Sequence, residues 1–127
     1  MDKKRSFHSI CRWTFNPGKG GFVPANIRPQ WDGQNLTTAD VVTLIKKRIA
    51  PRLPEWVTLG FELHYDTEIN ENNVAEVSDA MIDAGIYLAM ITPGAHSHFG
   101  YGGIASLDPE ERRQAEELGT RTVGLAY

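Results

Sequence analysis

Apolar and polar residues alternate most clearly between residues 57 and 66, and this alternation predicts a β-strand. The odd-numbered residues 57–63 are all apolar, whereas the even-numbered residues 58–64 are small, polar or ionisable and end with Glu62 and His64. Side chains of a strand alternate between its two faces, so Glu62 and His64 share the face opposite the apolar one. Because parallel α/β sheets place catalytic groups at the carboxyl ends of strands, His64 is a candidate acid, base or substrate ligand. The alternative is a histidine that is hydrogen-bonded at a strand end for structural reasons.

Three other segments are predicted to form strands. The first covers residues 7–15 (FHSICRWTF) and is followed by a turn signal at residues 16–21 and a long ordered loop that extends to Asn35. The next covers residues 86–92 (IYLAMIT) and is nearly all apolar, which predicts a strand covered on both faces. The last covers residues 121–127, after Gly119.

Helical periodicity and capping residues predict three helices between these strands. The first begins after Thr37, with Asp40 three residues later, and ends at Pro51. The second begins after Asn72 or Asn73 and ends at Gly85. The third begins after Asp108 with a proline at its first position and is expected to end at Gly119. The third helix has only two apolar residues, Ala115 and Leu118, too few to cover a pair of strands.

The element order β-α-β-α-β-α-β predicts an α/β unit with a parallel sheet over residues 1–127. Four strands with three helices correspond to half of an eight-stranded (β/α)8 barrel, a TIM half-barrel, or to a small open sheet. A chain of 127 residues, of which 41% are hydrophobic, has room for one core and little for a second domain.

Charge and cysteine content exclude some functional classes. A formal net charge of -3 argues against an electrostatic nucleic-acid binder, which normally carries a basic stripe. The N-terminal residues MDKKRSF have no apolar stretch behind them, so neither a secretory signal nor a membrane span is expected. Cys11 is the only cysteine and cannot form an internal disulfide, so we expect a cytoplasmic protein.

Five sequence segments resemble xylose isomerases, in the order in which that family has them. They are Cys11-Arg12-Trp13-Thr14, Ile27-Arg28-Pro29, Phe61-Glu62-Leu63-His64-Tyr65-Asp66, GGIASLD at 102–108 and ELGTRTV at 117–123. The resemblance covers nearly the whole chain and implies the N-terminal half of a metal-dependent sugar isomerase-like TIM barrel. Aldose-ketose isomerisation, epimerisation or a related proton transfer on a sugar would be its reaction.

The resemblance implies roles for individual residues. His64 matches a histidine that assists opening of the sugar ring, with Asp66 close to the position of its orienting aspartate. Trp13 matches a tryptophan that lines the sugar pocket, and Tyr127 stands roughly where a tryptophan packs under the sugar. Aromatic faces suit the apolar C–H side of a pyranose. Glu62 lies on the same inward face as His64 and is expected to bind substrate.

Three residues of the third strand and the following loop complete the expected substrate site. Thr92 lies where the family has a small polar residue, and His96 matches a loop position that shapes the pocket. Phe99, or Phe22 of the first loop, would present an aromatic edge to the sugar in its own or a neighbouring subunit; packing within the loop is the alternative. The alternating pair His96 and His98 is also compatible with a metal site, but we favour the pocket role.

In xylose isomerases, two divalent metal ions are held by the C-terminal half of the barrel. No segment of this sequence resembles that half. Mg²⁺ or Mn²⁺ is therefore expected only for the complete enzyme, with no metal ligand from this chain. The chain would be a piece of a longer or split polypeptide, a chain from which residues have been lost, or a half-barrel that pairs with another chain in a homo- or hetero-oligomer. Its expected ligand is a sugar or sugar-derived molecule. The alternative function is that of a non-catalytic half-barrel that acts through assembly with a partner chain, because an open sheet leaves unpaired edges.

Overall fold

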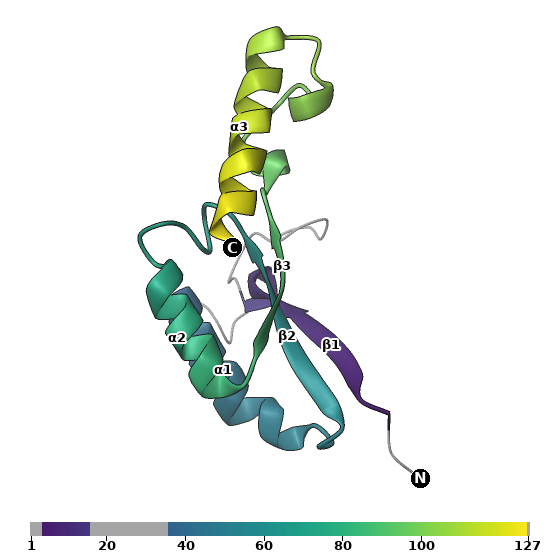
Figure 1. Ribbon diagram of the computed structural model, residues 1–127, viewed down its shortest axis with the longest axis vertical. Helices are drawn as coiled ribbons and strands as arrows, with labels where there is room; N and C mark the ends of the chain where they lie inside the picture. The colour runs from purple at the N-terminus through teal and green to yellow at the C-terminus, as the bar shows by residue number, and fades with distance from the viewer. Residues whose placement is uncertain (1–3, 16–35, 127) are drawn as a thin grey trace.

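The computed structural model describes residues 4–15 and 36–126 and shows an α/β arrangement around a three-stranded parallel sheet (Figure 1). The strands are β1 (Ser6–Cys11), β2 (Val57–His64) and β3 (Tyr87–Thr92), in the order β1-β2-β3. The helices are α1 (Thr38–Arg48), α2 (Val74–Ala84) and α3 (Pro109–Leu125). Short 3-10 helices are η1 (Arg12–Phe15), η3 (Ala50–Arg52), η4 (Ala95–Ser97) and η5 (Gly103–Ala105). The predicted parallel α/β class is confirmed.

Helix α1 forms where the sequence predicts it. The Thr37 side chain accepts a hydrogen bond from the Asp40 backbone N–H at 3.1 Å, and the Asp40 carboxylate accepts one from the Thr37 N–H at 3.0 Å, completing a capping box. Val41 and Ile45 are fully buried on the face that the helix turns toward the sheet. The helix ends at Arg48, and Pro51 lies in the following turn η3.

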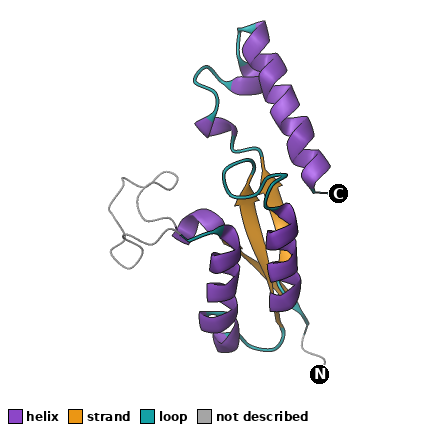
Figure 2. Cartoon of the chain, turned by 90° about the vertical axis from the view of Figure 1, so that its left-hand side faces the viewer, coloured by secondary structure: helices purple, strands orange, loops and turns teal. Residues whose placement is uncertain are grey.

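Helix α2 ends at Gly85, as predicted, because this residue takes a left-handed conformation with φ of 65°. Asn73 occupies the N-cap position but makes no side-chain cap; its Oδ1 accepts the Asn70 N–H instead, at 2.8 Å. Val77 and Met81 pack into the same core as the fully buried Phe61 and Leu63 of β2. Helices α1 and α2 therefore cover one face of the sheet (Figure 2).

The opposite face of the sheet carries no helix in the described part of the chain. Parallel pairing places Cys11 beside Glu62 and His64 beside Thr92. A register shift between Phe61 and Glu62 moves the pairing by one residue along β3. The sheet thus has a helix-covered side and a helix-free side, and the latter carries Glu62 and His64, as the alternation predicts.

Two predicted strands are longer than the observed ones. The first strand ends at Cys11, because Arg12 is buried and donates a hydrogen bond to the Leu36 carbonyl oxygen at 2.7 Å. That contact turns the backbone into η1 and toward the start of α1. The second strand ends at His64, where the carbonyl oxygen accepts the N–H groups of both Glu68 and Ile69 and closes a turn.

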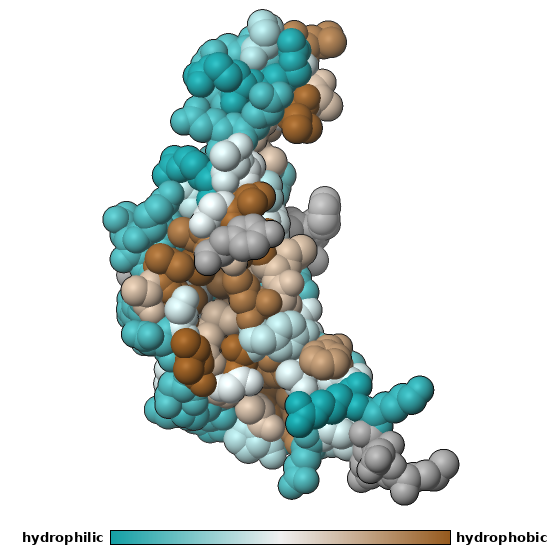
Figure 3. Space-filling view, in the orientation of Figure 1, coloured by the Kyte–Doolittle hydropathy of each residue, from teal (hydrophilic) through white to brown (hydrophobic). Residues whose placement is uncertain are grey.

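The expectation that residues 86–92 are covered on both faces is wrong. Within the described residues β3 is an edge strand, and Tyr87, Leu88 and Met90 are 37%, 39% and 44% exposed. Figure 3 shows an apolar surface in the middle of the molecule, where Figure 1 has β3 and α2. The apolar composition of this strand is typical of a central strand, but no neighbour on its outer edge is present among these residues.

The predicted fourth strand at residues 121–127 is also wrong. Helix α3 continues through Gly119 to Leu125, and Tyr127 lies outside the described residues. The hydroxyls of Thr120 and Thr122 donate to the carbonyl oxygens four residues earlier, and Leu125 packs against the core. A glycine inside a helix costs only about 1 kcal/mol, so Gly119 alone is not enough to end α3. The observed order is therefore β-α-β-α-β-α, and α3 extends beyond the carboxyl ends of the strands (Figure 1).

Candidate functional site

The most distinctive arrangement on the helix-free side is a stack of two rings at the carboxyl end of β2. The Trp13 and His64 rings lie 4.2 Å apart between centroids, with an angle of 18° between their planes. The turn of η1 directly after β1 brings Trp13 into this position. An imidazole on an indole face is held in orientation, and the indole removes water from one side of it.

The backbone after β2 brings a carboxylate to the same histidine. Glu68 is buried, and its Oε2 accepts the His64 backbone N–H at 2.8 Å and lies 3.6 Å from His64 Nδ1. The latter separation is longer than a hydrogen bond. The carboxylate near the imidazole is therefore that of Glu68 rather than that of Asp66.

Electrostatics favour the neutral form of His64. Burial lowers the pKa of the His64 imidazole below its usual value of 6.5, and the nearby His96 lowers it further. A neutral imidazole has one nitrogen free to accept a proton near neutral pH, so His64 can act as a general base.

A tight turn after β3 places His96 against His64. Gly94 takes a left-handed conformation with φ of 58°, and a Cβ at this residue would lie 3.1 Å from the Tyr65 carbonyl oxygen. The Ser97 hydroxyl donates to the Gly94 carbonyl oxygen at 2.7 Å, and the Thr92 hydroxyl accepts the Gly94 N–H at 3.2 Å. The His64 and His96 ring centroids are 5.4 Å apart.

The two histidines of the pair at 96 and 98 have different neighbours. His98 Nε2 lies 3.4 Å from Asp66 Oδ1, whereas the His96 ring contacts the His64 ring. No group of three or more histidine, cysteine, aspartate or glutamate side chains able to hold a metal ion occurs among residues 4–15 and 36–126.

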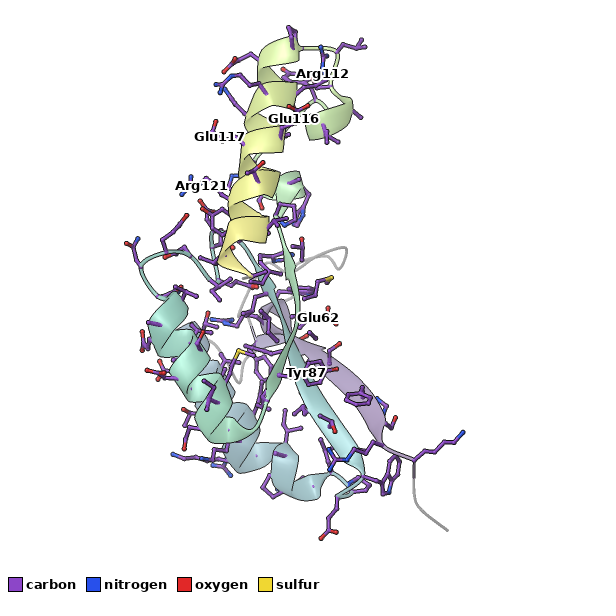
Figure 4. The ribbon with its side chains drawn as sticks, in the orientation of Figure 1. Glu62, Tyr87, Arg112, Glu116, Glu117 and Arg121 are labelled. Atoms are coloured by element: carbon purple, nitrogen blue, oxygen red, sulfur yellow. The ribbon has the colours of Figure 1, made fainter. Side chains whose placement is uncertain are left out.

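Glu62 lies in the middle of the helix-free face and binds two side chains of β1. Its carboxylate accepts a short hydrogen bond from the Ser9 hydroxyl and a bond from the Cys11 thiol at 3.2 Å. Figure 4 shows Glu62 on the sheet with Tyr87 near it on β3. Gly60 leaves the space that the Tyr87 ring fills, because a Cβ at residue 60 would lie 2.6 Å from Tyr87 Cζ.

The predicted site residues thus fall into a cluster and several outlying positions. Trp13, His64 and His96 lie together, and the Thr92 hydroxyl accepts the Gly94 N–H in the turn that carries His96. Glu62 lies two residues before His64 on the same face of β2. Phe99 lies against His98 and Gly103 in the loop after β3. Tyr127 and Phe22 lie outside the described residues.

Sequence reasoning missed Glu68 as the carboxylate beside His64. The available signal was that Glu68 follows His64 by four residues, with a turn between them. The direction of a side chain cannot be predicted when the geometry of the turn is unknown. In the structure, the same turn places Asp66 Oδ1 3.4 Å from His98 Nε2.

Comparisons with protein-family models, curated proteins and solved structures found no match for this chain. None of the helices in the described ranges is both long enough and apolar enough to cross a membrane. The function must therefore be argued from the geometry of the cluster around His64.

Proposed function

We propose that this chain is the N-terminal half of a sugar isomerase-like enzyme with a (β/α)8 barrel, and that the helix-free side of its sheet faces the substrate. Parallel strands with helices on one side and polar groups at the carboxyl end of the central strand are compatible with such a barrel. The absence of a fourth strand among the described residues leaves the closure of the barrel to residues beyond them or to another chain.

The stack of Trp13 on His64 is the observation that carries this proposal. A sugar presents hydroxyl groups on its rim and an apolar C–H face, so a pocket for it combines an aromatic surface with a few oriented polar groups. His64 supplies a neutral imidazole at the carboxyl end of the central strand, and Trp13 fixes its plane. In the proposed reaction His64 accepts the proton of the anomeric hydroxyl as the ring opens.

The later step, isomerisation of the open-chain sugar, would belong to the C-terminal half of the proposed barrel. Mg²⁺ or Mn²⁺ held by residues of that half would supply charge stabilisation at the substrate oxygens. The residues of this chain bind the sugar, orient it and move a proton at its anomeric oxygen.

Binding of a simple aldopyranose tests the proposed pocket. Xylose or glucose is titrated into ¹⁵N-labelled protein, and the indole signal that disappears in Trp13→Phe is followed together with the His64 ring signals. We expect both to move in a saturable manner, while the indole signal of Trp56, at the opposite end of β2, stays in place. Unchanged Trp13 and His64 signals at saturating concentrations of either sugar would contradict the proposal.

The exposed edge of β3 favours a second candidate function, a non-catalytic half-barrel that acts through assembly. Leu88 and Met90 are more than one-third exposed on a strand whose outer edge has no partner among the described residues, and such a surface promotes association. The two functions are separated by native mass spectrometry of the purified protein and by sugar turnover with added Mg²⁺ or Mn²⁺. A complex that turns over no sugar supports the assembly role, whereas turnover by the complex supports the isomerase-like role.

A further inference from the structure

We propose that His96 is a second proton-transfer residue, paired with His64, and that the two imidazoles act together on the two oxygens of a cyclic hemiacetal. This inference rests on the proposed function and deepens it, because it names the substrate class, hemiacetal sugars with a free anomeric hydroxyl. It also assigns ring opening to residues of this chain alone.

The backbone of the turn after β3 fixes the position of His96 beside His64. Gly94 lies so close to the β2 end that a Cβ there would be 3.6 Å from His64 Cβ, and η4 then begins at Ala95. The Ser97 N–H donates to the Gly94 carbonyl oxygen at 2.9 Å, which fixes the single turn that carries His96. The two imidazole planes meet at 66°, so the edge of one ring approaches the face of the other.

The surroundings of the pair separate the roles of its members. In the described part of the chain, two titratable side chains lie close to the His64 ring: Glu68 on its own turn and His96 from the facing turn. Behind the ring, η1 presents Trp13, which does not titrate, and Arg12, which donates to the Leu36 carbonyl oxygen and interacts through its charge with Glu68. His96 is exposed and His64 is half-buried. Because water solvates an exposed imidazolium better than a half-buried one, we assign the proton-donating role to His96 and the accepting role to His64.

A neutral and a protonated imidazole are the two groups that ring opening needs. His64 takes the proton of the anomeric hydroxyl, and the electron pair of that O–H bond becomes the carbonyl π bond. The bond between the anomeric carbon and the ring oxygen breaks, and the ring oxygen receives a proton from the His96 imidazolium. Both oxygens are bonded to the anomeric carbon, so the two imidazoles must lie close together, as they do. A proton passed back through water restores the pair, and no oxidant or metal ion takes part in this step.

Titration of His64 by NMR tests the pairing without any enzymatic activity. In the full chain, His96→Asn should move the His64 pKa upward, because the neighbouring positive charge is lost, while the effect of burial keeps it below the ordinary value. His98→Asn, which removes the histidine next to Asp66, is the matched control and should leave the His64 pKa in place. An equal His64 pKa in wild type and His96→Asn would overturn the pairing.

Polarimetry of freshly dissolved α-xylopyranose tests the chemical role. We expect wild-type protein to accelerate ring opening. His96→Asn should lower the catalysed rate by about 10²-fold or more, while His98→Asn keeps the wild-type rate. An equal acceleration by wild type and His96→Asn would overturn only the role of His96. No acceleration by wild type would count against the proposed function itself, whatever the NMR titration shows.

Discussion

At the scale of single residues, Glu62 contributes to a raised pKa of the Cys11 thiol on the helix-free face of the sheet. The thiol lies 3.2 Å from Glu62 Oε2 and is partly buried. Burial first, then the hydrogen bond to Glu62 and its negative charge, raise the Cys11 pKa from 9.0 to about 11. Since the thiolate is the nucleophile, Cys11 should react slowly at neutral pH.

Replacing Glu62 with glutamine should therefore make Cys11 more reactive. The amide carries no charge, so the Cys11 pKa falls toward 9.0 but stays above it because burial persists. Alkylation of the protein by iodoacetamide, followed by mass spectrometry across pH 7 to about 11, measures this pKa directly. Glu55→Gln, a change of an exposed carboxylate before β2, is the control and should match wild type. Equal profiles for all three proteins would show that Glu62 does not govern the thiol.

The same scale shows what could be predicted about the site. Strict alternation along β2 was enough to place Glu62 and His64 on one face, because strand geometry leaves a side chain only two directions. The partner of His64 was not predictable, because the turn after β2 determines whether Glu68 or Asp66 points at the ring. The neighbour His96 depended in the same way on the left-handed Gly94.

At the scale of elements, α3 shows where capping rules suffice and where they fail. The Asp108 side chain accepts the Glu110 N–H at 2.9 Å, so the predicted start is confirmed. Gly119 is the predicted helix end, but glycine ends a helix only when it leaves helical geometry. Ion pairs of Arg113 with Glu110 and Glu117 support the exposed face, and Arg121 binds Glu71 at 3.0 Å beyond the glycine.

Glu111, at the third position of α3, forms hydrogen bonds with the loop that precedes the helix. This buried carboxylate accepts the N–H groups of Tyr101 and Gly103, at 3.1 and 2.9 Å, and the Ser106 hydroxyl at 3.1 Å. The sequence shows only a glutamate in the first turn of the helix here, and nothing in its spacing shows that the loop folds back over it. The carboxylate orders the segment that contains η5.

Substituting Glu111 with alanine should destabilise the protein by about 2–4 kcal/mol, because two buried donors and one part-buried donor lose their acceptor. Urea unfolding followed by circular dichroism measures the change in the free energy of unfolding. Glu116→Ala changes an exposed residue one turn further along α3 and should cost less than about 0.5 kcal/mol. Similar losses in the two variants would mean that the Glu111 hydrogen bonds contribute little.

At the scale of the whole molecule, helices cover one face of the sheet, whereas the outer edge of β3 has no partner strand among the described residues. Helices α1 and α2 seal the core against Phe61 and Leu63, whereas the β3 edge carries exposed apolar side chains (Figure 3). Such an edge offers unpaired backbone groups next to apolar surface, a combination that promotes association. The parallel three-stranded core followed from hydrophobic periodicity, but the openness of this edge could not, because the sequence of β3 is that of a central strand.

We expect the purified chain to associate through the β3 edge. Met90→Lys places a charge on that strand and should shift sedimentation velocity profiles toward the monomer. Leu107→Lys is the control, because Leu107 is 97% exposed in the loop before α3 and far along the chain from β3. Circular dichroism confirms that both variants fold. Equal association of the two variants, or a wild-type protein that is monomeric throughout, would contradict association through β3.

The central claim, that neutral His64 opens a sugar ring beside Trp13, is tested most directly by the pH dependence of α-xylopyranose ring opening in wild type and His64→Asn. The lowered pKa of His64 means that the base is lost only as pH falls below its usual value of 6.5, so the wild-type rate should hold near neutral pH and decline in acid. His64→Asn should lower the catalysed rate by about 10²- to 10⁴-fold and abolish that acid decline. The same rate and the same pH profile in both proteins would contradict the account.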